Sequence, residues 1–135
     1  MSNDELRITN FSARVTALYQ SYGEIDDLEG TIQAEVQETV DAILWARDRR
    51  GEAYDRRSDD ERDLSSTRLK VDNLASSVRA AIEAALFEAE GTWGGVDEAP
   101  TAYRGSMSDL RDLRGDLAKL KADIDRICAE VDKFS

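Results

Sequence analysis

Histidine is absent from the 135 residues, and cysteine and proline each occur only once. Without histidine the chain lacks the side chain that most often serves as a general base near neutral pH. The lone Cys128 excludes a disulfide within the chain, and no histidine is available to activate it as a nucleophile. We therefore interpret Cys128 as a structural thiol, and we expect a protein that is not an enzyme and binds no cofactor.

Spacings typical of metal and phosphate sites are also missing. The sequence contains no zinc spacing, no Gly-rich phosphate loop, no dinucleotide fingerprint and no Glu-x-x-His pair. Asp59, Asp60 and Asp63 could gather around a cation, but the glycine and the closing glutamate of a calcium loop are absent. Solvated carboxylates are the simpler interpretation, so we expect no metal site.

No stretch approaches the ~18 consecutive apolar residues of a membrane-spanning helix. The first residues, 1–6, lack the basic and then apolar pattern of a signal peptide. We therefore expect no membrane insertion, and a location in the cytoplasm or within a virion or secreted assembly.

Acidic residues exceed basic ones, with 29 Asp and Glu against 18 Lys and Arg and a formal net charge of -11. This excess argues against direct binding of nucleic acid or of anionic membranes. A high-salt cytoplasm favours such a composition because salt screens the repulsion between carboxylates, and a GC-rich genome favours Arg over Lys. We therefore expect a halophilic or GC-rich source.

A regular heptad pattern occupies the last third of the chain. With Tyr103 at position a, nine of the ten a and d positions are apolar, and the exception is Ser106. This spacing over more than four heptads predicts a coiled-coil or bundle helix whose apolar row is an association seam. The residues predicted to form the seam are Tyr103, Leu110, Leu113, Leu117, Leu120, Ile124, Ile127 and Val131.

Charged residues flank this seam unequally, because every g position is acidic whereas two e positions are basic. A parallel pairing of two copies sets Asp109 against Arg114 and Asp116 against Lys121, whereas an antiparallel pairing sets acid against acid. If the helix self-associates, we therefore predict a parallel homodimer or small homo-oligomer. The alternative is that it packs against earlier helices of its own chain, and exposed ion pairs of ~0–1 kcal/mol do not decide between the two.

The acidic g row also permits a different interpretation. It consists of Asp109, Asp116, Asp123 and Glu130. Its members stand one heptad, or ~10 Å, apart along the helix axis. Rows from two helices could interdigitate and resemble the phosphates of DNA, although ordinary solvated charge is the simpler interpretation.

The rest of the chain predicts two further amphipathic helices in a single domain, residues 1–135. The first covers about 10–48, where Gly23 and Gly30 predict a bend or the close approach of a neighbouring helix. The second covers about 65–90. Residues 47–64 are strongly charged, with Tyr54 as the only large apolar residue before Leu64, so they form either a helical extension or a connector.

A turn is predicted at 91–96 from Gly91, Trp93, Gly94 and Gly95. Gly91 can end a helix in the left-handed conformation, and Trp93 is predicted to cover the end of the bundle. The last helix then covers about 98–134, so the second and third helices should form an antiparallel hairpin.

The segment around this turn resembles the WXG100 proteins of type VII secretion. Trp93-Gly94-Gly95 lies between two predicted helices, and the similarity extends over about 66–134. The resemblance implies a helical hairpin that pairs with a partner of similar fold. In this chain an additional helix precedes the hairpin.

Together these patterns predict an all-α fold of three long amphipathic helices, arranged up-down-up or as an elongated coiled coil. We expect a non-enzymatic structural or adaptor protein that acts through helix–helix association. Its partner would be a second copy or another helical protein, in an assembly such as a virion or secretion apparatus. The alternatives are a WXG100-like secretion factor and an acidic DNA mimic that inhibits a nucleic-acid-binding protein.

Overall fold

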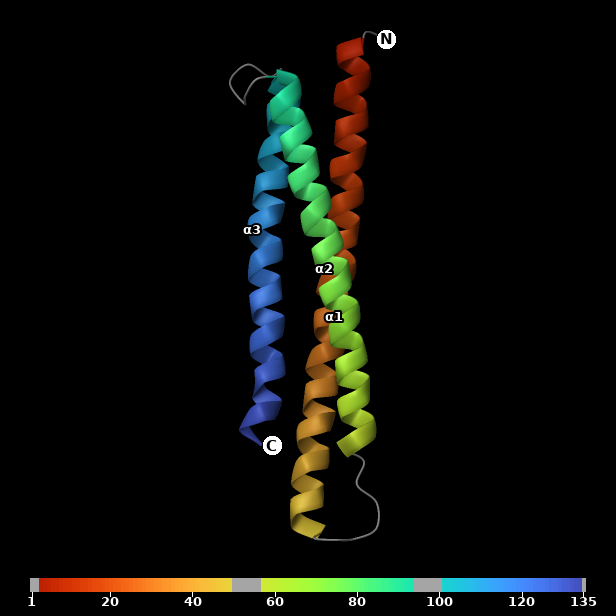
Figure 1. Ribbon diagram of the computed structural model, residues 1–135, viewed down its shortest axis with the longest axis vertical. Coiled ribbons are helices and arrows are strands. Elements are labelled where there is room, and N and C mark those ends of the chain that lie inside the picture. Colours follow the sequence, from red (N-terminus) through yellow and green to blue (C-terminus); the bar gives the residue numbers. More distant parts are fainter. Residues whose placement is uncertain (1–2, 50–56, 94–100, 135) are drawn as a thin grey trace.

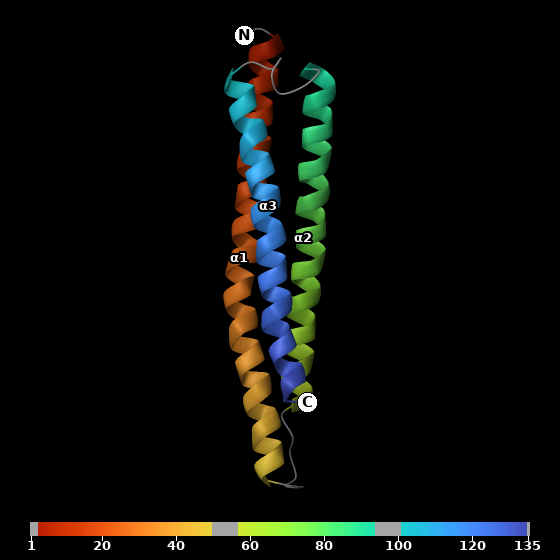
Figure 2. The same ribbon diagram turned by 90° about the vertical axis from the view of Figure 1, so that its left-hand side faces the viewer.

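The computed structural model describes residues 3–49, 57–93 and 101–134. They form three long helices, α1 (Asn3–Arg49), α2 (Arg57–Trp93) and α3 (Thr101–Ala129), followed by a short 3-10 helix, η1 (Glu130–Lys133). The long helices lie side by side in an elongated bundle, and each contacts the other two (Figures 1 and 2). The predicted all-α three-helix fold is therefore confirmed.

Polar contacts between the helices fix their relative directions. Glu90 near the end of α2 pairs with Arg111 in the first half of α3, whereas Asp72 in the first half of α2 pairs with Lys121 in the second half of α3. These two helices are therefore antiparallel, as predicted. The hydroxyl oxygens of Ser12 and Ser106 lie 3.3 Å apart near the starts of α1 and α3, so α1 and α3 run in the same direction. The arrangement is up-down-up.

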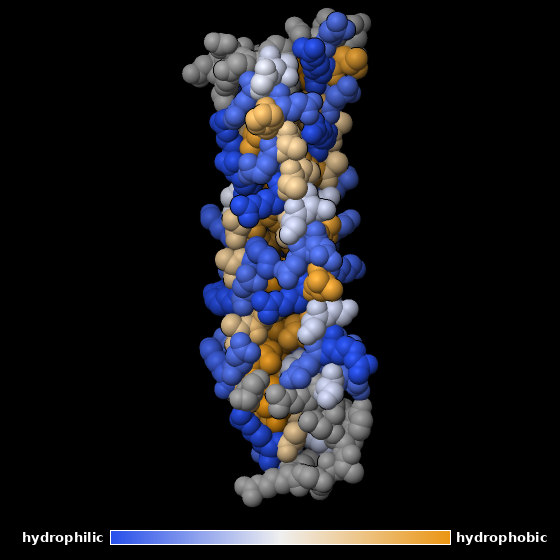
Figure 3. Space-filling view, in the orientation of Figure 1, coloured by the Kyte–Doolittle hydropathy of each residue, from blue (hydrophilic) through white to orange (hydrophobic). Residues whose placement is uncertain are grey.

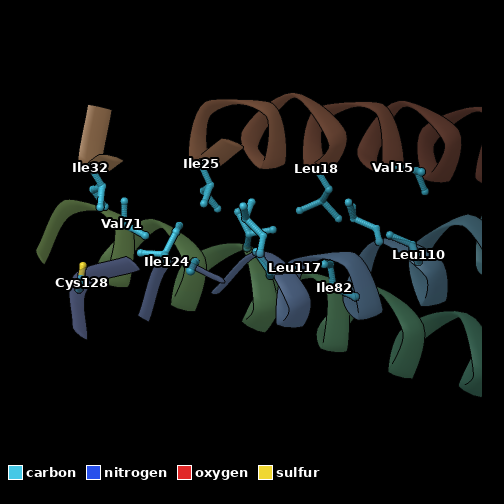
Figure 4. Packing of buried hydrophobic residues seen from close by; sticks show 14 of the residues in the cluster. Val15, Leu18, Ile25, Ile32, Val71, Ile82, Leu110, Leu117, Ile124 and Cys128 are labelled. Atoms are coloured by element: carbon cyan, nitrogen blue, oxygen red, sulfur yellow. The ribbon is translucent and has the colours of Figure 1, made fainter. Parts of the chain in front are cut away.

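One apolar core follows the axis of the bundle. Figure 4 shows Ile25 and Ile32 of α1, Val71 of α2 and Ile124 of α3 pointing toward one another. Full burial of a side chain of this size contributes ~1.5–3 kcal/mol relative to exposure. The largest side chains with less than 2% of their surface exposed are Ile25, Ile32, Thr39, Val71, Ile82, Met107, Leu110, Leu113 and Ile124.

Thr39 is the one polar residue in that set, and its hydroxyl group is satisfied locally. Its Oγ1 donates a hydrogen bond of 2.8 Å to the carbonyl oxygen of Glu35, one turn earlier in α1. Because this hydrogen bond compensates the hydroxyl for the loss of water, the residue fits within the apolar core.

Both of the first two helices begin earlier than the sequence pattern predicts. α1 begins at Asn3 rather than near residue 10, and Ile8 in its added turns packs against the core. α2 begins at Arg57 rather than near residue 65, and Leu64 in its added turns is buried. The end of the charged 47–64 segment is therefore helical, while residues 50–56 lie outside the described residues.

Predictions made from glycine need correction. α2 continues through Gly91 to Trp93, so Gly91 does not end that helix. α1 runs unbroken through Gly23 and Gly30, and a Cβ atom added at either would meet nothing within 4 Å. Both glycines therefore leave open space beside them, and the predicted close helix approach is wrong. Gly94, Gly95 and the side chain of Trp93 lie outside the described residues, as does the start of the third helix before Thr101.

Candidate functional site

The predicted seam of α3 lies inside the bundle. Leu110, Leu113 and Ile124 have no exposed surface, and Ile127 is partly buried against the core. The side chain of Tyr103 is outside the described residues. Packing against the earlier helices is therefore the alternative that this structure adopts, and self-association through the same row would require the helices to separate. The other buried seam residues are Leu117, Leu120 and Val131.

The buried face of α3 is wider than the a and d positions alone. Met107 and Cys128 occupy e positions, and both are buried. A helix with two neighbours needs a broader apolar stripe than one strand of a two-stranded coiled coil. The sequence does contain a signal for this broader buried face. The apolar Met107 directly follows Ser106, the one polar position of the seam.

Burial raises the pKa of the Cys128 thiol, with smaller electrostatic effects from Arg68 and Asp125. The reactive thiolate is therefore scarce at neutral pH, in agreement with a structural thiol. We expect alkylation of Cys128 by iodoacetamide to be slow in the native chain and to accelerate at least ~10-fold in denaturant, when burial is lost. Equal rates in the two states, measured by mass spectrometry, would contradict this burial.

The basic e positions of α3 pair with α2. Arg114 lies 3.3 Å from Glu83, and Lys121 lies 2.6 Å from Asp72. Burial alone would lower the pKa of Lys121, but its hydrogen bonds to Asp125 and Asp72 raise that pKa above its ordinary value. Within the chain, Arg114 and Lys121 thus find cross-helix partners other than the g-position carboxylates that a parallel dimer would supply.

Acidic side chains of α1 and α3 face each other across a groove of about 240 Å³. Asp26 and Glu29 come from α1, whereas Asp116 and Asp123 come from α3. We call this the acidic groove. Its remaining lining residues are Tyr22, Lys119 and Leu120.

Burial and the gathered carboxylates together change the pKa values of two residues in this groove. Burial, followed by the charges of Asp123 and Asp26, raises the pKa of Glu29, and Arg126 opposes this rise. Burial, followed by Asp116, Asp26 and Glu29, raises the pKa of Tyr22. The groove therefore has an excess of negative charge, which disfavours further ionisation.

Glu29→Gln is expected to stabilise the fold at pH 7 by ~0.5 kcal/mol, the size of a like-charge contact. The raised folded-state pKa of Glu29 means that folding disfavours its carboxylate form. This penalty is absent below the unfolded value near 4.5 and appears as pH rises through the folded value. The gain should therefore be present at pH 7 and absent near pH 4, as measured by urea unfolding.

The matched control is Glu24→Gln, which removes the same charge from an exposed position of α1. We expect a smaller change for this variant. An equal gain for Glu29→Gln at both pH values would contradict the role of the acidic groove.

Two large apolar residues on α2 face solvent instead of the core. Phe87 is 81% exposed and Leu69 is 61% exposed, the two highest values among the large apolar residues that the structure describes. The predicted seam does not include them. Both lie outside the buried apolar stripe of α2. A large apolar residue at such a position is the sequence signal that could have identified them.

Neither a metal site nor a membrane span is found in the described part of the chain. Within residues 3–49, 57–93 and 101–134, no three Asp, Glu or Cys side chains are placed to hold a metal ion. None of the helices there carries an apolar stretch long enough to cross a bilayer. Comparisons with protein-family models, curated proteins and solved structures found no match.

Proposed function

We propose that this chain is a non-enzymatic structural or adaptor protein that acts by helix–helix association. The observation that carries the proposal is the contrast between the two faces of α2. One surface is packed into a continuous core, whereas the other leaves Phe87 and Leu69 in contact with solvent. Exposed apolar groups of this size favour burial against a partner, because their removal from water is favourable.

The test is the mass of the purified chain in solution, measured by light scattering from ~1 µM to ~1 mM. We expect a mass above the 15.1 kDa of one chain at the higher concentrations, with helical circular dichroism unchanged. A chain that stays at 15.1 kDa throughout would contradict self-association and leave only a different helical protein as partner.

A second candidate function, mimicry of DNA, is supported by the acidic groove. Asp26 and Glu29 of α1 line this groove together with Asp116 and Asp123 of α3, so carboxylates from two helices gather on one surface. Lys119 and Arg126 lie among them and reduce the net charge. This function predicts 1:1 capture of a basic DNA-binding domain that weakens steeply with salt and is lost in the triple variant Asp26→Asn, Asp116→Asn, Asp123→Asn. Capture that survives those substitutions would exclude the groove as the binding surface.

The WXG100 resemblance agrees with the antiparallel pairing of α2 and α3. No family model matches the chain, and the residues after Trp93 in the motif lie outside the described part. No further observation favours secretion, so helix–helix association remains the proposal.

A further inference from the structure

The outward face of α2 is free of charge over more than six turns. Val71, Val78 and Ile82 point into the core, and the residues on the opposite side of the helix are exposed. In Figure 3 pale and orange side chains run along α2 on the face turned to the viewer. We call this surface the α2 outer face; it consists of Ser66, Leu69, Asn73, Ser76, Ser77, Ala80, Ala84, Phe87 and Gly91.

The two large residues of this face are related by the helix geometry. Leu69 and Phe87 are separated by eighteen residues, which is five full turns or ~27 Å, so they point in the same direction. The residues between them are small or short, so the surface between them is shallow. A straight helix could therefore lie along the face and contact both large residues at once.

We propose that the α2 outer face binds the α2 outer face of a second copy in an antiparallel pair. The position midway between Leu69 and Phe87 along the helix is Val78, so a two-fold axis at that height, on the outer side of α2, places each Phe87 over Leu69 of the other copy. An interface that repeats its own contacts in this way is the usual form of a homodimer. The inference rests on the proposed function, because it assigns a surface and a partner to the same association.

The charges that border the face support this occupant. In an antiparallel pair each border meets the same border of the other copy, so Lys70 comes within one turn of the second copy's Glu88. Among the described residues Lys70 makes no ion pair, whereas Glu88 pairs with Arg14 at 2.8 Å. On the other border Arg68 comes near the second copy's Glu90, but each already has a partner on α3, because Arg68 pairs with Asp125 at 3.6 Å and Glu90 pairs with Arg111 at 3.1 Å.

Like charges on that second border are already neutralised. Asp72 and Glu83 of the two copies come level with each other, but Lys121 pairs with Asp72 and Arg114 pairs with Glu83 within each chain. Arg79 of one copy lies near Arg79 of the other copy, and both lie between the carboxylates of Asp72 and Glu83. A parallel pair would instead set Glu88 beside Glu90, and Lys70 beside Asp72, which already pairs with Lys121. Only the antiparallel arrangement brings Lys70 to Glu88, so that arrangement is favoured.

The experiment is sedimentation equilibrium of the full chain from ~1 µM to ~1 mM, for the wild type and three variants. We expect the wild type to form a reversible dimer of twice 15.1 kDa. Phe87→Asp should weaken the dimer by ~30-fold or more, because an unpaired charge would enter its apolar contact. Lys70→Glu should weaken it by ~3- to 10-fold by opposing Glu88, on the scale of charge pairs at an interface rim.

The matched control is Ala13→Asp, which adds the same charge at an exposed position of α1 and should dimerise like the wild type. Because Phe87 is 81% exposed, its variant should keep the wild-type circular dichroism. If the wild type is monomeric at all these concentrations, a second copy does not bind the α2 outer face. If Phe87→Asp dimerises with wild-type affinity, the α2 outer face is not the interface, but the chain still associates with itself through another surface. An unchanged dimer in Lys70→Glu would overturn the antiparallel arrangement.

Discussion

Leu113→Ala is expected to lower the free energy of unfolding by ~2–5 kcal/mol, the range for deletion of a buried leucine side chain. Leu113 has no exposed surface, lies at a d position in the middle of α3, and belongs to the core cluster that includes residues of α1 and α2. Its truncation removes apolar contacts and leaves a cavity, because a core of three long helices relaxes only partly around one site. Urea unfolding followed by circular dichroism measures the change.

The matched control is Leu69→Ala, which makes the same truncation at a position that is 61% exposed. Below the concentration at which copies associate, we expect a change within ~0.5 kcal/mol. Equal losses for the two variants would mean that the α3 row is not the core of the folded chain.

Ala85→Leu is expected to destabilise the chain by ~1–3 kcal/mol through overpacking. Ala85 and Ala89 are fully buried near the end of α2, where their small side chains fill the space facing the neighbouring helices. A leucine at position 85 would force neighbouring side chains away from their preferred rotamers or push α2 outward. The measurement is again the free energy of unfolding in urea.

Ala122→Leu on the exposed side of α3 controls for the added leucine itself. It should change stability by less than ~0.5 kcal/mol, because alanine and leucine have similar helix propensities and the site is open to solvent. A stabilising effect of Ala85→Leu would show that the end of the bundle contains unfilled space.

The heptad pattern predicted which face of α3 is buried, but not what buries it. Leu110, Leu117 and Ile124 form an apolar row whether the neighbour is another helix of the chain or a second copy. The flanking charges could not decide, since Arg114 and Lys121 find carboxylates on α2 as readily as on a parallel copy. The answer depends on packing along the whole length of α1 and α2, which a local pattern does not contain.

The early helix starts were missed because charged turns carry little periodic signal. The first turns of α2 offer one buried side chain, Leu64, while Asp59 and Asp60 favour a helix N-terminus through the helix dipole. The candidate association residues were missed for the opposite reason. Leu69 and Phe87 interrupt the polar face of α2, and a search for the buried stripe passes over such interruptions.

The acidic groove was only partly predictable. The g row of α3 was evident from its spacing, but its position opposite Asp26 and Glu29 depends on α1 lying parallel to α3. That direction follows from the two chain reversals that join the three helices. The raised pKa of Glu29 is a consequence of this arrangement, not of its neighbours in sequence alone.

The most direct test of the central claim, that the α3 seam is filled by α1 and α2 of the same chain, is helical content on dilution. Far-ultraviolet circular dichroism should be recorded from ~100 µM to ~50 nM, a range over which any dimer through the α2 outer face would dissociate. If the seam is closed within one chain, helical content per residue stays constant as the copies separate. A progressive loss of helix on dilution would show that the row from Leu110 to Val131 is buried between copies, and would contradict the account.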